Sequence, residues 1–312
     1  MMKRTVNQKV WTGRIDEPTT LDNLRYHQVV VHNENESEGK TCALLGFECE
    51  EGVRRNAGRL GAEKAPDAIR TELAKLPWNF PEGHALYDGG NVVCEGEMLE
   101  KAQAELGEEV NQLLSKRMNP IILGGGHETF FGHYLGVRKW IGPEAKLGII
   151  NIDAHFDLRS YDQQPSSGTM FKQVLDSDEL SSYFVIGIQR FGNTNELFQR
   201  AKEMDVSYIL EEELELSLTF NKIEEFMERN DYVLFTLCMD VLNAAFAPGV
   251  SATSPFGLHP ATVRNIIRKI ATSPKTLSFD ICEVNPSVDE NGRTVKLGAY
   301  FVNEAIASFF ER

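Results

Sequence analysis

Residues 147–157 read Leu-Gly-Ile-Ile-Asn-Ile-Asp-Ala-His-Phe-Asp, an apolar run that passes directly into three potential metal ligands. A run that is apolar on consecutive residues is typical of a β-strand buried on both faces. In open α/β sheets, ligands bind outside the carboxyl ends of the strands. Because alternate residues of an extended chain share a face, we expect Asp153, His155 and Asp157 to point into one site.

The same order, an apolar run followed by polar residues, recurs at three further places. Candidate ligands follow these runs at His127 after 120–123, at Cys238 and Asp240 after 232–237, and at Asp280 and Glu283 after 277–279. A tight turn or a solvated strand end would explain any one of them alone, but not their recurrence. Carboxylates with imidazoles suit hard or borderline divalent ions, Mn²⁺ among them. Two such ions can share a water molecule and lower its pKa.

Apolar runs alternate with helical patterns along the chain, which favours crossover units and a mostly parallel sheet covered on both faces. The predicted strands are 42–47, 120–123, 147–152, 183–188, 206–210, 232–237 and 276–281. The predicted helices are 65–76, 97–117, 129–141, 195–205, 219–229, 260–272 and 297–311. We therefore expect a three-layer αβα sandwich in a single domain, 41–312, after an N-terminal extension and loop at 1–40 that is polar and irregular from Arg14 to Lys40.

Composition narrows the class of protein. The chain has 312 residues, 42% of them hydrophobic, and a net charge of −14, which disfavours nucleic acid as a partner. No apolar run approaches the length of a membrane-spanning helix, and residues 1–12 lack the apolar core of a signal peptide. The five cysteines show no CxxC spacing, as expected of reduced thiols. We expect a cytoplasmic protein with no membrane partner and a small-molecule substrate.

These motifs resemble those of the ureohydrolase superfamily, which includes arginases and agmatinases. Its GGxH, DAHxD, SxDxDxxDP and EVNP-type motifs correspond to residues 125–127, 153–157, 236–244 and 283–286, and residues 58–70 resemble an upstream segment. The resemblance implies an arginase-like αβα fold, two Mn²⁺ ions per subunit and hydrolysis of a C–N bond of a linear amidine. We also expect a homo-oligomer.

Within the superfamily the sequence is most similar to the formimidoylglutamase branch. Residues 54–59 read RRNAGR, 166–169 read SSGT and 187–189 read GIQ, as in that branch. The resemblance implies hydrolysis of N-formimidoyl-L-glutamate to L-glutamate and formamide in histidine degradation. Metal-activated hydroxide would attack the formimino carbon. Ser167 stands in the segment where arginases carry a histidine that shuttles protons, and the general acid that takes over this role is open.

The resemblance also assigns metal ligands. They are His127, Asp153, His155, Asp157 and Asp240, with Asp153 bridging both ions, and Cys238 at a place where the superfamily has an aspartate. A thiolate at Cys238 would tilt the site away from manganese, and a neutral thiol would weaken one ion. Both possibilities are open, and they put the second ion in doubt.

The remaining site residues are expected to act on the substrate. Asp157 is the candidate to accept the proton of the attacking water, and Glu283 to pair with the cationic formimino group. The substrate's two carboxylates require cations, for which Arg54, Arg55, Arg59 and Arg190 are candidates because a planar guanidinium binds carboxylate in a bidentate manner. For each arginine the alternative is a structural or surface role.

Three other functions compete with this hypothesis. An agmatinase or another guanidino ureohydrolase would release urea. An inactive metal-binding homologue would explain Cys238. A dehydrogenase is disfavoured because the glycines at 124–126 lack the GxGxxG spacing.

Overall fold

A mixed sheet forms the middle of the molecule in the computed structural model, which describes residues 3–5, 7–16, 20–34 and 39–312. The strand order is β1-β3-β2-β4-β9-β8-β5-β6-β7, and every neighbouring pair is parallel except β1 with β3. The strands are Lys3–Arg4 (β1), Lys40–Glu48 (β2), His84–Val93 (β3), Asn119–Leu123 (β4), Leu147–Ile152 (β5), Ser181–Ile188 (β6), Ser207–Leu210 (β7), Tyr232–Cys238 (β8) and Thr276–Cys282 (β9).

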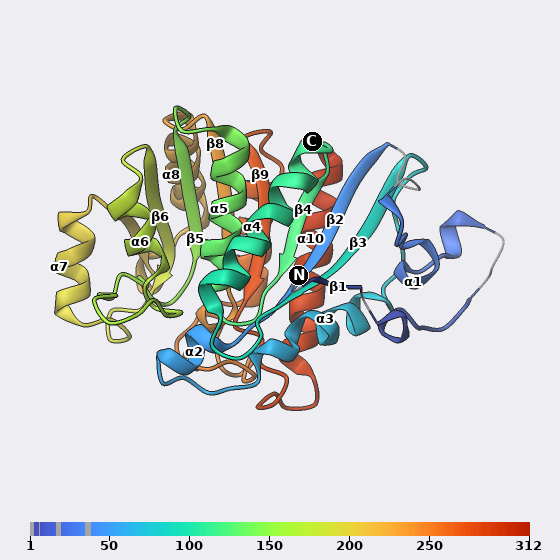
Figure 1. The fold of residues 1–312 in the computed structure, drawn as a ribbon, viewed down its shortest axis with the longest axis horizontal. Helices are drawn as coiled ribbons and strands as arrows, with labels where there is room; N and C mark the ends of the chain where they lie inside the picture. The colour runs from blue at the N-terminus through green and yellow to red at the C-terminus, as the bar shows by residue number, and fades with distance from the viewer. Residues whose placement is uncertain (1–2, 6, 17–19, 35–38) are drawn as a thin grey trace.

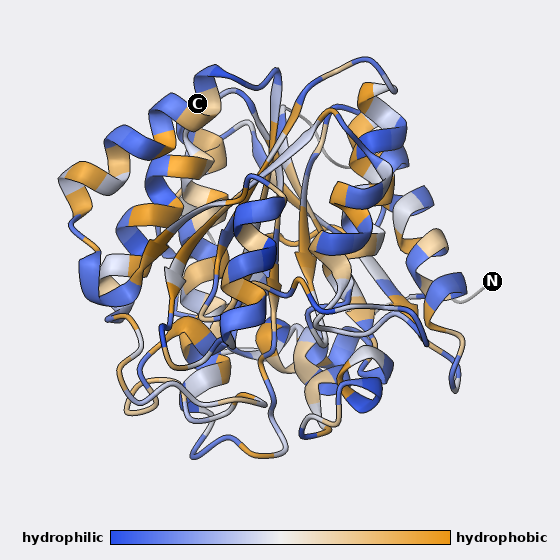
Figure 2. Cartoon of the chain, turned by 90° about the vertical axis from the view of Figure 1, so that its left-hand side faces the viewer, coloured by the Kyte–Doolittle hydropathy of each residue, from blue (hydrophilic) through white to orange (hydrophobic). Residues whose placement is uncertain are grey.

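Helices cover both faces of this sheet (Figure 1). They are Tyr26–Val29 (α1), Glu51–Arg55 (α2), Ala65–Leu73 (α3), Leu99–Ser115 (α4), Thr129–Ile141 (α5), Met170–Ser177 (α6), Asn195–Glu203 (α7), Leu216–Glu228 (α8), Pro260–Ala271 (α9) and Arg293–Glu311 (α10). One core cluster joins the sheet to α3, α8, α9 and α10, and a second joins it to α4, α5, α6 and α7. The predicted three-layer αβα sandwich is confirmed. Apolar residues concentrate in the strands and in the helix faces turned toward them (Figure 2).

Helix α9 illustrates how the sequence specifies these elements. It begins at Pro260, where a missing N–H is tolerated, and the ring of His259 accepts a hydrogen bond from the backbone N–H of Ala261 at 3.1 Å. Val263, Ile266, Ile267 and Ile270 repeat at helical spacing and are buried. The apolar stripe places α9 against the sheet.

Strand β3 escaped sequence prediction because polar residues interrupt it. Asp88 and Asn91 lie in its middle, and both are buried against the guanidinium of Arg70, which is itself fully buried. Arg70 Nη2 lies 2.8 Å from Asp88 Oδ1, and Nη1 donates to Asn91 Oδ1 at 2.6 Å. The buried ion pair explains how a polar segment forms an interior strand.

The N-terminal residues are more ordered than an irregular loop. Tyr26 in α1 is fully buried, and its hydroxyl donates to Asn303 of α10 at 2.8 Å. Trp11 donates from Nε1 to Asp88 Oδ2 at 2.7 Å. The segment from Arg14 to Lys40, predicted to be irregular, therefore contains helix α1, which the buried Tyr26 holds against α10. Residues 17–19 and 35–38 of that segment lie outside the described residues.

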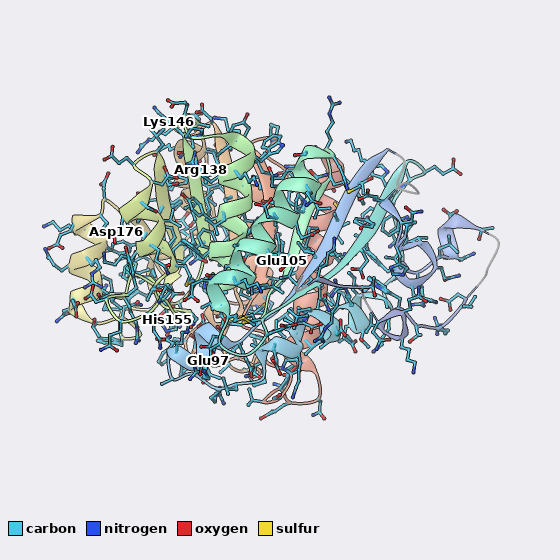
Figure 3. All side chains as sticks on the ribbon, in the orientation of Figure 1. Glu97, Glu105, Arg138, Lys146, His155 and Asp176 are labelled. Carbon is cyan, nitrogen blue, oxygen red and sulfur yellow. The ribbon has the colours of Figure 1, made fainter. Side chains whose placement is uncertain are left out.

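The register of the sheet brings four strand ends to one level. Ile152 of β5 pairs with Leu237 of β8, Leu237 pairs with Ile281 of β9, and Ile281 pairs with Leu123 of β4. Since these strands are parallel neighbours, the residues that follow them meet at one edge of the sheet. Figure 3 shows the two ends of β5 at opposite edges, with Lys146 before the strand and His155 after it.

Candidate metal centre

The Asp153–Asp157 motif is a turn, not an extended strand end. Strand β5 stops at Ile152, and the backbone N–H of His155 folds back to donate to Asp153 Oδ1 at 2.8 Å. Asp157 has a φ of 50°, in the left-handed region. The expected alternation of side chains along an extended chain is therefore wrong. The three side chains converge because the backbone turns after β5.

One group of ligand atoms surrounds the ring of His127, which follows β4. Its Nδ1 lies 3.1 Å from Asp153 Oδ2 and 3.0 Å from Asp157 Oδ2. Ligand atoms of His127, Asp153 and Cys238 all lie within 4.8 Å of one another. Imidazole, carboxylate and thiol thus meet in one small volume.

A second group shares Asp153 with the first. Ligand atoms of Asp153, His155 and Asp240 lie within 4.8 Å of one another, and His155 Nδ1 is 3.1 Å from Asp240 Oδ2. Asp240 Oδ1 is buried and has no hydrogen-bond partner among the described residues. A buried carboxylate oxygen without a partner is unfavourable unless a cation meets it. The donor set fits a pair of divalent ions that share Asp153.

The electrostatics of the cluster point the same way. Burial lowers the pKa of His127, but its contacts with Asp153 and Asp157 outweigh burial, and the pKa lies well above its ordinary value. Burial and the neighbouring Asp153 raise the pKa of Asp157. Like charges brought together out of water disfavour ionisation, and a cation among them reverses this. A cation among these groups would therefore favour the ionised form of the carboxyls.

Glu283 closes the cluster from the end of β9. Its backbone N–H donates to Gly125 O at 2.8 Å, and its Oε1 accepts from the backbone N–H of His127 at 3.0 Å. Burial raises the pKa of Glu283 to about 8, with further contributions from Glu128 and Asp240. A cationic partner at this place would hold the carboxyl ionised. Like Asp157, Glu283 has a left-handed backbone, with a φ of 66°.

Cys238 is the last residue of β8 and is buried beside these carboxylates. Burial raises the pKa of its thiol well above the usual value, and Asp153 and Asp240 raise it further. Without a cation the thiol is therefore protonated. The position of Cys238 next to His127 and Asp153 is compatible with both a ligating thiolate and a neutral thiol.

A cavity of about 120 Å³ opens over the cluster. Among the predicted site residues it is lined by His127, His155, Asp157, Cys238, Asp240 and Glu283, while Asp153 is fully buried and is not among its lining residues. Arg159 lines its wall together with Asn56 and Ser167. Among the described residues, the guanidinium of Arg159 has no ion-pair partner. The cavity thus combines a carboxylate-rich floor with an arginine in its wall.

The four arginines predicted to bind substrate do not line this cavity. Arg190 pairs with Glu212 at 2.6 Å, and Arg59 donates to Ser251 O at 2.8 Å and to Val250 O. Arg54 is half-exposed and pairs with Glu51 at 2.6 Å. Each guanidinium already has acceptors, so the structure gives none of these three a free face toward the cavity. Their role in substrate binding stays a prediction.

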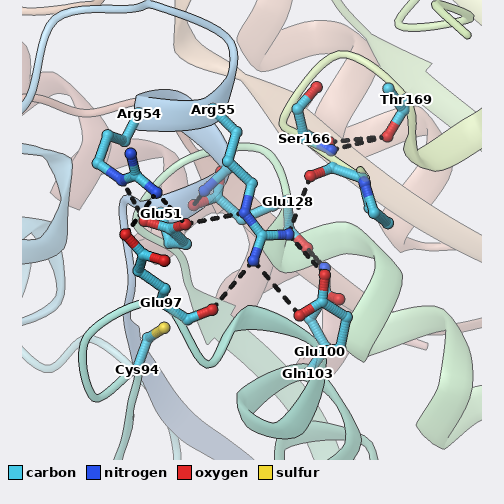
Figure 4. Close-up of polar contacts among 12 residues, drawn as sticks. Glu51, Arg54, Arg55, Cys94, Glu97, Glu100, Gln103, Glu128, Ser166 and Thr169 are labelled. Carbon is cyan, nitrogen blue, oxygen red and sulfur yellow. Dashed lines mark hydrogen bonds and ion pairs between the residues drawn. The ribbon is translucent and has the colours of Figure 1, made fainter. Parts of the chain in front are cut away.

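Arg55 lies in the interior and joins three segments (Figure 4). Its Nε donates to Glu51 at 2.8 Å, its Nη1 to Glu100 at 2.5 Å and to Pro165 O at 3.1 Å. Only 7% of its side chain is exposed. These contacts hold α2, α4 and the loop before Ser166 together. Arg55 therefore shapes the wall that carries Ser167.

Sequence reasoning missed several residues around the cluster. Arg159 stands two residues after Asp157, and a cation so close to an acidic motif was the available signal. Asn151 donates from Nδ2 to Asp153 Oδ2 at 3.0 Å and so orients that carboxylate. A polar residue inside the apolar run 147–152 was its signal. Outer contacts of this kind fix the orientation of ligand side chains.

The family model of the arginase family matches residues 40–308. The chain belongs to the arginase family. It is 54% identical to a formimidoylglutamase of Lysinibacillus sphaericus over 98% of this chain and 97% of that protein.

Two solved structures share the fold. The crystal structure of formimidoylglutamase from Bacillus subtilis has a TM-score of 0.82 and 24% identity, with 91% of each chain covered. A variant of formiminoglutamase from Trypanosoma cruzi, crystallised with Mn²⁺, has a TM-score of 0.81 and 25% identity, with 89% of this chain and 96% of that chain covered. The arginase-like architecture expected from the sequence is thereby confirmed.

Proposed function

We propose that this protein hydrolyses N-formimidoyl-L-glutamate to L-glutamate and formamide, a step of histidine degradation. Support comes from the full-length relatives named formimidoylglutamase, at up to 54% identity. The observation that carries the proposal into the structure is Arg159, which lines a cavity floored by carboxylates and whose guanidinium has no ion-pair partner among the described residues. The substrate has a cationic amidine at one end and carboxylates at the other, so it matches both.

Arg159 is the proposed anchor of the substrate's glutamate end. Its backbone N–H donates to Gly168 O at 2.9 Å, which ties its position to the loop that carries Ser167. A guanidinium presents parallel donors that fit a carboxylate. Among the arginines, Arg159 has the position and the free face that this task requires.

Two Mn²⁺ ions are the proposed cofactor. His127, Asp153, Asp157 and Cys238 would hold one, and Asp153, His155 and Asp240 the other. Such a pair supplies a water molecule of lowered pKa and a Lewis acid for a C–N hydrolysis. Whether the thiol of Cys238 ligates or only packs decides how tightly the first ion is held.

The carboxylates have distinct proposed roles. Asp157 is solvent-accessible in the cavity, is within reach of the first metal position, and is proposed to accept the proton of the attacking water. Glu283 faces the same cavity and is proposed to bind the N–H groups of the formimino carbon. A carboxylate is the matched acceptor for a planar cation with N–H donors.

The cytoplasm and a homo-oligomeric state are part of the proposal. All five cysteines are free, as is usual for a reducing compartment. Among the described residues, no helix has the length and apolar character that crossing a membrane requires. Light scattering on the purified protein tests the oligomeric state.

Product analysis tests the function. The purified protein with Mn²⁺ is incubated separately with formimidoylglutamate, agmatine and arginine, and formamide, urea and ammonia are measured. Formamide and glutamate from formimidoylglutamate alone are expected. Urea from agmatine or arginine would establish a guanidino ureohydrolase instead. No product from any of the three, with metal bound, would favour the inactive homologue.

A further inference from the structure

A chain of buried hydrogen bonds lies behind His127, on the side away from the cavity. His127 Nε2 lies 3.1 Å from Thr236 Oγ1, and Thr236 Oγ1 donates to Asp280 Oδ1 at 2.6 Å. Asp280 Oδ2 lies 2.6 Å from His133 Nδ1. All four side chains are buried, with at most 1% of each residue exposed.

The far end of the chain is anchored in the core. His133 Nε2 lies 2.6 Å from Ser278 Oγ, and the thiol of Cys282 donates to Asp280 Oδ1 at 3.1 Å. Three donor groups therefore surround the two oxygens of Asp280: the His133 ring, the Thr236 hydroxyl and the Cys282 thiol. An ionised carboxylate accepts and does not donate, so Asp280 accepts a hydrogen bond from each of them.

The direction of these hydrogen bonds determines which ring nitrogen of His127 carries the hydrogen. A threonine hydroxyl has a single hydrogen, and Thr236 gives it to Asp280. Its contact with His127 must then be one in which the oxygen accepts, so the hydrogen belongs to His127 Nε2. In the neutral ring the opposite nitrogen, Nδ1, carries the lone pair. That lone pair faces Asp153 and Asp157, in the first metal position.

We propose that Thr236 and Asp280 are positioning residues that hold His127 in the tautomer whose Nδ1 can bind metal. The inference rests on the proposed function only in taking His127 as a metal ligand. Neither residue lines the cavity, so neither touches substrate. They act indirectly, by fixing the orientation of the His127 ring and the nitrogen that carries its hydrogen.

Two substitutions at Thr236 separate this role from simple packing. Thr236→Val keeps the volume and removes the hydroxyl, whereas Thr236→Ser keeps the hydroxyl and removes a methyl group. Mn²⁺ affinity is measured by calorimetry on chelator-stripped full-length protein. We expect Thr236→Val to weaken Mn²⁺ binding by about 10- to 100-fold and Thr236→Ser to bind Mn²⁺ with an affinity close to that of the wild type. A packing role predicts the opposite order, and that order would overturn the proposal.

Asp280→Asn tests the direction of the chain. The amide would present an N–H to Thr236 Oγ1, whose hydroxyl would then donate its hydrogen to His127 Nε2. The hydrogen of the neutral ring would then sit on Nδ1, the nitrogen that faces Asp153 and Asp157. An aspartate-to-asparagine change behind a catalytic histidine acts in this way, by imposing the wrong tautomer at unchanged geometry. We expect Mn²⁺ binding at least as weak as in Thr236→Val. If Asp280→Asn does not fold, the Thr236 pair still decides.

Thr276→Val is the matched control. Thr276 is a fully buried threonine at the opposite end of β9, and its hydroxyl donates to Ile270 O at 2.6 Å. The variant loses a buried hydroxyl bond of the same kind without contact to the cluster. We expect wild-type Mn²⁺ affinity.

The binding measurement uses no substrate, so it fails separately from the proposed function. Wild-type affinity in Thr236→Val, or no Mn²⁺ binding by the wild-type chain, would overturn the inference. If the variants behave as expected but formimidoylglutamate is not hydrolysed, the proposed function falls and the inference stands.

Discussion

Nδ1 of His155 lies 3.1 Å from Oδ2 of Asp240, so the turn after β5 and the end of β8 meet in one polar contact. The other oxygen of Asp240, Oδ1, is buried without a partner among the described residues. Asp240 Oδ1 and the imidazole ring of His155 are therefore available as ligands for an ion. This half of the site contains only nitrogen and oxygen donors, which suits manganese.

Asp240→Asn should remove one ion and leave the other. The amide keeps the size of the side chain but loses the charge that offsets a divalent cation, so Mn²⁺ content should fall from two to about one per chain. Elemental analysis after dialysis measures it. Asp205→Asn is the control, since Asp205 is exposed and its left-handed backbone also accepts asparagine. Unchanged metal content in Asp240→Asn would contradict the assignment.

Cys238→Asp should tighten Mn²⁺ binding while destabilising the metal-free protein. The new carboxylate is a harder ligand, but it enters a pocket that already holds Asp153 and Asp240. Thermal unfolding with and without Mn²⁺ should show a larger metal-dependent rise than in wild type. Cys238→Ser separates the loss of sulfur from the gain of charge, and equal rises in both variants would argue that the residue at 238 does not ligate.

Arg159→Gln should raise KM much more than it lowers kcat. The variant loses the free guanidinium in the cavity wall but leaves the metal ligands in place. Loss of a charged hydrogen bond to substrate is worth about 1.5 to 3 kcal/mol, roughly 10- to 150-fold in KM. Arg190→Gln is compared in the same assay, because Arg190 was predicted from the sequence and pairs with Glu212 outside the cavity. A larger effect at Arg190 would reverse the assignment.

Arg55→Ala should lower the free energy of unfolding far more than Arg54→Ala. Both arginines pair with the buried Glu51, but Arg55 is itself buried whereas 47% of the Arg54 side chain is exposed. Removing one partner of a buried pair costs about 3 to 5 kcal/mol, and of an exposed pair about 0 to 1 kcal/mol. Urea unfolding measures both. Similar values for the two variants would show that Arg55 does not hold the loops together.

Chelation of metal should lower the unfolding temperature. Asp153, Asp157, Asp240 and Glu283 are crowded into one region, and their mutual repulsion is relieved by cations. An ion at a hundred times its Kd stabilises the folded state by about 2.7 kcal/mol. Calorimetry with a chelator, with Mn²⁺ and with Mg²⁺ tests this, and an unfolding temperature that ignores Mn²⁺ would count against a metal centre.

The fold was predictable where burial leaves a simple pattern. Strands β5 and β8 are covered on both faces, so their sequences are apolar on consecutive residues. Strand β3 was not predictable, because its buried polar residues are paired with Arg70 from helix α3. Such a contact between distant segments exists only in the folded chain and leaves no local pattern in the sequence. Helix α2 has only five residues, too few to show a period.

The candidate ligand residues at the strand ends could be predicted from the sequence, but the residues that surround them and line the cavity wall could not. Level strand ends are a consequence of parallel register, so His127, Asp153 and Glu283 could be expected at one edge. Which arginine lines the cavity depends on tertiary contacts that the sequence does not show: Arg190 pairs with Glu212, whereas Arg159 has no ion-pair partner in the part of the chain that the structure describes. The turn at 153–157 likewise depends on a hydrogen bond from His155 to Asp153.

The left-handed backbones of Asp157 and Glu283 have a consequence for the evolution of this protein. A non-glycine residue in such a conformation costs on the order of 1 to 3 kcal/mol when the surroundings impose it. Glycine would relax the chain at either position and delete a carboxylate that the chemistry needs. Selection for turnover therefore keeps both positions away from their most stable residue, and attempts to raise heat resistance have to begin elsewhere in the chain.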